Sequence, residues 1–220
     1  MKFIIFDLDD TLLCGDCERE WINFLFLKGL IKDPKSKLDQ FDQSYRRGTL
    51  SFEEYSNFIQ SPIIGMTKVR VDSYVNEFIK KNINNLTDKL TSDLLNEAKS
   101  ADKVLIASGS HDYLVDGFTN FFKIDSGIGT SAELKNNIFT GQLLGEPTFS
   151  NGKVKAVEKW CLDNGLKVNQ SIFYSDSIND LPMFEACGVP IAVNPDDKLK
   201  KLPKKDLTGS LIDSFYLIIV

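Results

Sequence analysis

The sequence predicts an α/β fold, a doubly wound parallel sheet with a helical segment inserted after its first strand. Apolar runs typical of buried strands alternate with stretches of helical periodicity from about residue 86 onward. No convincing strand pattern occurs between residues 15 and 100, where the spacing of apolar residues is helical. We therefore expect a sheet-based core of residues 1–14 and 88–220 and a helical domain of residues 15–87.

Apolar runs define the strands of the predicted core. Residues 2–6 (KFIIF) form a near-continuous apolar run, which is typical of a strand buried on both faces of a parallel sheet. Residues 215–220 are too few to span a bilayer and favour a final strand or a tail docked on the core. The other expected strands are residues 103–107, 171–174 and 189–193, with short strands near 124–128 and 138–144, the second a hairpin near Gly141.

Helical periodicity defines the remaining elements. Residues 18–27 form the first expected helix, which Gly29 ends as a C-terminal cap. Residues 37–90 keep helical spacing with predicted breaks at 48–49, 61–62 and 82–85, and Ser51 begins a helix with acids in its first turn. Later helices are expected at residues 86–99, 111–122, 151–162 and 181–186.

The composition excludes several classes of protein. The chain has 220 residues and a net charge of −5, which gives no electrostatic footprint for nucleic acid, and the basic run 198–205 is expected to be a solvated face. The strand predicted at residues 2–6 has no charged segment, long apolar segment or cleavage site of an export signal around it, so we expect the cytoplasm. We also expect a monomer or homodimer with no membrane partner. Cys14 and Cys17 have the spacing of a redox or zinc motif, but with one histidine we expect reduced thiols.

Three aspartates directly follow the first predicted strand, in the segment FDLDDT of residues 6–11. Open α/β sheets bind ligands beyond the carboxyl ends of their strands, so these acids lie where chemistry is expected. In extended backbone alternate side chains share a face, which lets Asp7 and Asp9 line one pocket. Such a pair needs a cation or a shared proton, and one carboxylate can then be a nucleophile while the other transfers protons. An acidic turn that only caps the strand is the alternative that this spacing leaves open.

Two later strand ends also carry polar residues. Ser108 and Gly109 follow one strand, and a hydroxyl with backbone N–H groups at a helix start makes an anion site. Asp176, Asn179 and Asp180 follow another, and their oxygens suit Mg²⁺ with water completing its shell. Each pattern alone also fits a turn or a helix cap, but a phosphate and its metal need all three parts together.

In order and spacing, these motifs resemble those of the haloacid dehalogenase-like phosphatase superfamily. The matching segments are residues 7–11 (DLDDT), 107–110 (ASGS), Lys153 and 175–180 (SDSIND). The resemblance implies a Rossmann-like core, and the helical insertion is similar to the C1 cap of that superfamily. Residues 13–21, with 152–154 downstream, look most like the phosphoserine phosphatase-like branch, subfamily IB.

The resemblance implies a role for each matching residue. Asp7 would attack phosphorus and form an aspartyl-phosphate, and Asp9 would protonate the leaving oxygen and then accept a proton from water. The Asp7 and Asp176 side chains and the main-chain carbonyl of Asp9 would ligate Mg²⁺. The remaining implied positions are Ser108, Gly109 and Lys153, which would hold the phosphoryl oxygens, and Asn179 and Asp180, which would orient the ligands from behind.

Substrate choice is expected to lie in the helical domain. Asp16 occupies the place where phosphoserine phosphatases carry a glutamate near the substrate amine, and His111 is placed to reach the phosphate or leaving group. The arginine that those enzymes use for the substrate carboxylate is missing after residues 48–52, which argues against phosphoserine. Arg46 and Arg47 could substitute from the preceding turn, although a surface position is the simpler expectation for both.

The expected function is Mg²⁺-dependent hydrolysis of a small phosphorylated metabolite. A phosphotransferase or mutase would use the same aspartyl-phosphate and is the alternative enzyme class. A phospho-accepting signalling module also clusters aspartates around Mg²⁺, but such modules lack a sizeable helical insertion and the Asp-x-Asp spacing.

Overall fold

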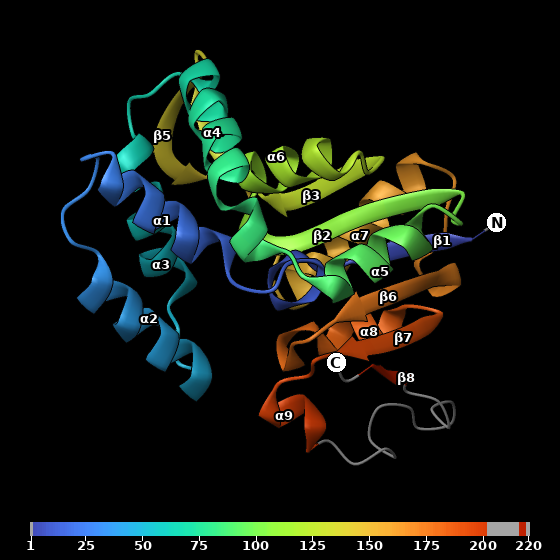
Figure 1. Ribbon diagram of the computed structural model, residues 1–220. Coiled ribbons are helices and arrows are strands. Elements are labelled where there is room, and N and C mark those ends of the chain that lie inside the picture. Colours follow the sequence, from blue (N-terminus) through green and yellow to red (C-terminus); the bar gives the residue numbers. More distant parts are fainter. Residues whose placement is uncertain (1, 202–215, 219–220) are drawn as a thin grey trace.

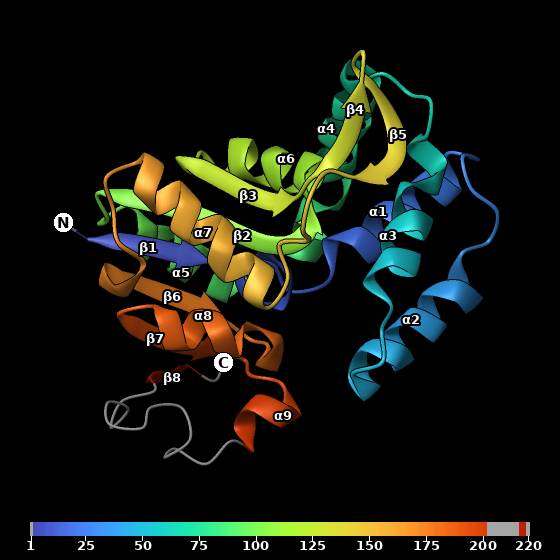
Figure 2. The same ribbon diagram turned by 180° about the vertical axis from the view of Figure 1, so that it is seen from behind.

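The computed structural model describes residues 2–201 and 216–218 and is built around a six-stranded sheet (Figures 1 and 2). The strand order is β3-β2-β1-β6-β7-β8, and every neighbouring pair is parallel. This confirms the predicted fold class. The strands are β1 (Phe3–Phe6), β2 (Lys103–His111), β3 (Ser126–Thr130), β6 (Ser171–Ser175), β7 (Val189–Val193) and β8 (Tyr216–Ile218).

Helices cover both faces of the sheet, which explains the apolar run in β1. Ile4 and Phe6 pack toward α5 (Lys89–Ala98) and α6 (Asp112–Phe122). Phe3 and Ile5 point to the other face, toward α7 (Asn151–Asp163) and α8 (Leu181–Ala186). All four β1 side chains are buried, so neither face of the strand could carry polar residues.

The segment between β1 and β2 is helical, as the sequence predicts. It forms α1 (Cys17–Leu27), α2 (Lys35–Arg47), α3 (Phe52–Gln60) and α4 (Lys68–Leu86), followed by α5. The first three lie beyond the carboxyl end of the sheet (Figure 1). Asp16, Ser51 and Thr67 cap α1, α3 and α4 by accepting hydrogen bonds from backbone N–H groups. Gly48 ends α2 with a left-handed φ of 73°, which a side chain would strain.

Three predicted details are wrong. The break at residues 82–85 does not occur, because the Asn82 side chain donates to the Phe78 carbonyl and α4 continues to Leu86. The next helix begins at Lys89 rather than residue 86, where Asp88 and Thr91 form a capping box. The sequence also missed β4 (Ala132–Lys135), which pairs antiparallel with β5 (Ile138–Leu143) outside the main sheet.

A continuous apolar core joins the helical segment to the sheet-based part. The Phe78 ring on α4 lies 5.6 Å from Trp21 of α1 and 6.3 Å from Phe118 of α6. The β4–β5 hairpin adds a backbone bridge between Ile138 and Thr67. The division at residues 15–87 stays a prediction, and this core crosses it.

Two sequence expectations extend beyond the described residues. Positions 202–205 of the basic run and positions 215, 219 and 220 of the last segment lie outside them. The described part of the basic run forms α9 (Asp197–Lys200), and β8 confirms a strand within the last segment. Among the helices described, none has both the length and the apolar character needed to cross a membrane.

Candidate active site

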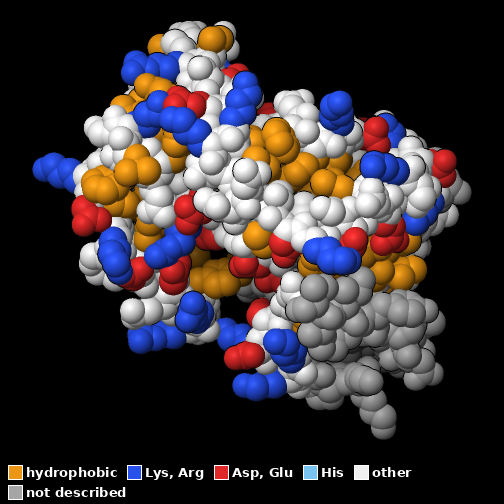
Figure 3. All heavy atoms as spheres, viewed as in Figure 1, with side chains coloured by type: hydrophobic (Ala, Val, Ile, Leu, Met, Phe, Trp, Pro, Cys, Tyr) orange, Lys and Arg blue, Asp and Glu red, His pale blue; other side chains and the backbone are white. Residues whose placement is uncertain are grey.

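The three predicted strand ends meet at one pocket of about 420 Å³. Its floor is formed by residues at the carboxyl ends of β1, β2 and β6, and its opposite wall by side chains of α1, α2 and α3. Figure 3 shows the molecule hollowed between these helices and the sheet, with acidic side chains beside the hollow. Because neighbouring strands are parallel, motifs about 100 and 170 residues apart in the chain share one edge of the sheet.

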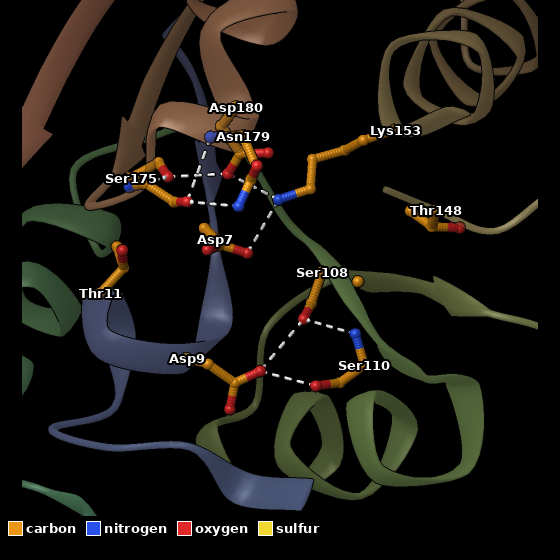
Figure 4. A network of polar contacts seen from close by, with 12 residues as sticks. Asp7, Asp9, Thr11, Ser108, Ser110, Thr148, Lys153, Ser175, Asn179 and Asp180 are labelled. Atoms are coloured by element: carbon orange, nitrogen blue, oxygen red, sulfur yellow. Dashed lines mark hydrogen bonds and ion pairs between the residues drawn. The ribbon is translucent and has the colours of Figure 1, made fainter. Parts of the chain in front are cut away.

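Lys153 joins two of the three motifs. Its buried ammonium group donates to Asp7 Oδ1 at 2.9 Å and to Asp180 Oδ2 at 2.7 Å (Figure 4). Burial raises the pKa of Asp7 to about 7, although the charge of Lys153 acts in the opposite direction. Burial alone would lower the pKa of Lys153, but Asp180 and Asp7 raise it above its usual value. The lysine is therefore a fixed cation between two carboxylates.

The start of α7 seats Lys153 by close packing. A Cβ at Gly152 would lie only 2.0 Å from the carbonyl oxygen of Pro147, so glycine alone fits this approach. Within residues 152–154, Gly152 therefore allows the close backbone approach and Lys153 supplies the positive charge.

Asp9 is held on both of its carboxylate oxygens. Its backbone is extended, and the left-handed Asp10 (φ 52°) follows it. Oδ1 accepts from the Cys17 N–H at 2.7 Å. Oδ2 accepts from the hydroxyls of Ser110 at 2.6 Å and Ser108 at 3.4 Å (Figure 4). Burial raises the pKa of Asp9, against the effect of the hydrogen bonds from Cys17 and Ser110.

Sequence reasoning missed the partners of Asp9. Ser110 lies inside the recognised segment ASGS, but nothing in its spacing points to Asp9. Cys17 donates to Asp9 through its backbone N–H. None of the four cysteines forms a disulfide bond.

The predicted metal ligands face the same pocket. Asp7, Asp9 and Asp176 all line it, and Thr11 donates to Asp176 Oδ1 at 3.2 Å. Burial raises the pKa of Asp176 well above its usual range, and the nearby Asp7 and Asp10 raise it further. A site where several carboxylates resist ionisation favours a bound cation, and carboxylate and carbonyl oxygens suit Mg²⁺. Within residues 2–201 and 216–218 no three His, Cys, Asp or Glu side chains form a metal cluster, so the proposed set depends on the Asp9 carbonyl and water.

The remaining predicted residues of the core lie at the same place. Ser108 and Gly109 line the pocket, and a Cβ at Gly109 would already touch the Phe149 ring at 3.4 Å. Asp180 also accepts from the Ser175 hydroxyl at 2.7 Å. Asn179 donates to the Ser177 hydroxyl at 3.2 Å, which fixes the loop that carries Asp176.

The structure separates the three residues proposed for substrate choice. Asp16 and Arg46 line the pocket, as expected. His111 does not, because it is fully buried and both of its ring nitrogens are engaged, by Glu18 and by Ser56. The expectation that His111 reaches the phosphate or leaving group therefore has no support in this geometry.

The helical wall of the pocket carries aromatic side chains between its charged ones, which the sequence did not indicate. Tyr45 on α2 reaches across to the loop after β6, where its hydroxyl lies 3.1 Å from that of Ser177. Burial raises the pKa of Tyr45 to about 12, so the hydroxyl stays protonated at neutral pH. The aromatic side chains of the pocket are Phe41, Tyr45, Phe52, Tyr55 and Phe149.

Comparisons with known proteins identify the family of the chain. The chain is 29% identical over 208 residues to a histidinol-phosphatase of Neisseria meningitidis, covering 91% of this chain and 94% of that protein. It is 26% identical over 215 residues to a phosphoserine phosphatase of Mycobacterium tuberculosis, an alignment that covers 91% of this chain and 67% of that protein. The crystal structure of a protein of unknown function from Bordetella pertussis superposes with a TM-score of 0.85 at 27% identity, covering 99% and 98%. The family model of the haloacid dehalogenase-like hydrolases matches residues 4–185, and the chain belongs to this family of enzymes.

Proposed function

We propose that the protein is a Mg²⁺-dependent phosphatase that hydrolyses a small phosphomonoester through an aspartyl-phosphate on Asp7. The observation that carries this proposal is the Lys153 bridge, which places a fixed cation beside Asp7 in the pocket that Asp9 and Asp176 also line. A nucleophile, a second carboxylate, a cation and oxygen ligands in one place are what phosphoryl transfer requires.

In the proposed reaction, the Asp7 carboxylate attacks phosphorus while the bond to the leaving oxygen breaks. Asp9 donates a proton to that oxygen, then accepts a proton from the water that cleaves the aspartyl-phosphate, which releases inorganic phosphate and restores Asp7. Lys153, the Ser108 hydroxyl and the Gly109 N–H hold the phosphoryl oxygens and offset their charge in the transition state.

The residues present fit a magnesium ion. The Asp7 and Asp176 carboxylates and the main-chain carbonyl of Asp9 would hold it, and the hydrogen bond from Thr11 orients Asp176 for this role. When bound, Mg²⁺ neutralises negative charge and so lets an anionic nucleophile approach an anionic phosphate.

We further propose that the leaving group carries a positive charge. The half-buried Asp16 lines the pocket and has no Lys or Arg salt-bridge partner in the described part of the chain, and the aromatic wall next to it suits an apolar or aromatic body. Phosphoserine and histidinol phosphate, the substrates named for two relatives, both carry an amine, and only phosphoserine also carries a carboxylate.

Phosphate release from a panel of phosphorylated metabolites tests the function. With Mg²⁺ we expect release from at least one alkyl phosphate, histidinol phosphate and phosphoserine included. With EDTA we expect almost none, because the charge of Lys153, which Asp7 shares with Asp180, does not by itself also offset the charge of the phosphate. No release from any ester by folded protein that binds Mg²⁺ would contradict hydrolysis. Phosphate transfer that requires an acceptor would indicate a phosphotransferase instead.

Two charge-removing variants test the substrate side of the pocket. Asp16→Asn keeps a good helix cap but removes the charge, so we expect KM for amine-bearing esters to rise about tenfold while 4-nitrophenyl phosphate changes little. Arg46→Met should raise KM for phosphoserine but not for histidinol phosphate, which has no carboxylate.

Arg47→Met is the matched control for the second variant, because Arg47 is the next residue on α2 and does not line the pocket. Equal losses on amine-bearing and aryl esters would count against a substrate role for Asp16.

A further inference from the structure

A chain of four buried polar side chains lies behind the pocket. The Glu18 carboxylate accepts from the backbone N–H of His111 at 2.9 Å and contacts its ring Nδ1 at 2.5 Å. The other ring nitrogen lies 2.8 Å from the Ser56 hydroxyl, which accepts from the Gln60 side chain at 3.0 Å. These four residues are 0–3% exposed and come from α1, β2 and α3.

The chain has one consistent hydrogen-bond direction. Glu18 can only accept, so a neutral His111 carries its proton on Nδ1. Its Nε2 then accepts from the Ser56 hydroxyl, and Ser56 in turn accepts from Gln60. Stability alone does not explain this set, because replacing both partners of a buried hydrogen bond by apolar groups of similar shape is often nearly neutral. Its location gives a better explanation.

Glu18 and His111 are the sequence neighbours of two residues that donate hydrogen bonds to Asp9. Cys17, which precedes Glu18, donates its N–H to Asp9 Oδ1. Ser110, which precedes His111, donates its hydroxyl to Asp9 Oδ2. Two adjacent residues of α1 and two of β2 thus meet around one carboxylate, and the Glu18–His111 contact fixes the distance between these segments.

The same chain also reaches the substrate side of the pocket. Ser56 anchors α3 to His111, and its neighbour Tyr55 lines the pocket wall. One buried set therefore ties the donors of Asp9 to the helix that faces the leaving group.

We propose that Glu18 and His111 are positioning residues for proton transfer by Asp9. This rests on the function proposed above, in which Asp9 protonates the leaving oxygen. Glu18 lies at the wall of the pocket, whereas His111 does not line it. The pair acts by holding Cys17 and Ser110, and hence Asp9, in register with the strand end that carries Ser108 and Gly109.

The test compares two esters that need the acid to different degrees. An alkyl phosphate requires a proton on its leaving oxygen, whereas 4-nitrophenyl phosphate releases a stabilised anion with little help. His111→Phe should therefore lower kcat/KM for the best alkyl ester of the panel about tenfold more than for the aryl ester. This is a fraction of the roughly 10²- to 10⁴-fold rate enhancement that a positioned general acid contributes. His111→Asn, whose side-chain N–H can replace Nδ1–H toward Glu18, should restore most of the wild-type ratio.

Gln60→Met is the matched control, because it alters the far end of the same buried chain without touching a partner of Asp9. It should lower the melting temperature and leave the alkyl-to-aryl ratio of kcat/KM unchanged.

Equal losses on both esters in His111→Phe, or no rescue by His111→Asn, would overturn the positioning role and leave the proposed function intact. If the wild type cleaves neither ester, the proposed function fails first. Should His111→Phe not fold, His111→Gln, which lacks a donor at the Nδ1 position, replaces it in the comparison.

Discussion

Asp7→Asn is expected to reduce phosphate release by about 10⁴-fold or more, because an amide cannot attack phosphorus in place of the carboxylate. The measurement is steady-state phosphate release with Mg²⁺, together with a search for phosphorylated protein after rapid acid quenching. Wild-type protein should give an acid-quenched species that carries phosphate on Asp7, and the variant should give none. A variant with near-normal turnover would rule out Asp7 as the nucleophile.

The fold of this variant should be intact, and its stability has a predictable pH dependence. The pKa of Asp7 is raised from 3.8 to about 7, so the folded wild type binds this proton more tightly than the unfolded chain does. Its contribution to the free energy of unfolding is therefore present below about pH 4 and is lost as the pH rises to about 7. Asn cannot ionise, so in EDTA the stability of the variant relative to wild type should increase over this interval. Urea denaturation at several pH values measures the difference.

Lys153→Met is expected to lower kcat/KM by about 10²- to 10³-fold, because it removes a cation that would bind the phosphoryl oxygens. It should also destabilise the metal-free protein, since Asp7 and Asp180 lose their shared partner in a buried site. The pKa of Lys153 is raised, so its charge supports the fold at all pH values below its ordinary pKa of 10.5. The loss should be larger at pH 8 than at pH 5, because Asp7, with a pKa of about 7, is protonated at pH 5 and needs no partner.

Lys155→Met provides the matched control on the same helix. Lys155 pairs with Glu146 at 2.8 Å, but both side chains are more than half exposed. Such surface pairs contribute about 0–1 kcal/mol, so this variant should keep its activity and nearly all of its stability. If both lysine variants lose activity equally, the role assigned to Lys153 is wrong.

Much of the fold could be predicted because its signals are local. The buried strands of the sheet are continuous apolar runs, and the helices of residues 15–87 keep one periodicity. Errors arose where a local signal was ambiguous. The asparagines near residue 82 resemble a helix break, yet the Asn82 side chain bonds within its own helix. The short β4 strand has little apolar pattern because it pairs in a small hairpin outside the main sheet.

The sequence by itself determined which strand ends carry the proposed chemistry. Parallel strands place their carboxyl ends at one edge, so Asp7, Ser108 and Asp176 had to meet once the strand pattern was known. Only the tertiary structure decided which side chains hold them. Ser110 reaches Asp9 across 101 positions of the chain, and His111 turns away from the pocket to Glu18, 93 positions earlier. Such contacts depend on how separate elements pack against one another, and packing between distant segments leaves no periodic signal in the sequence.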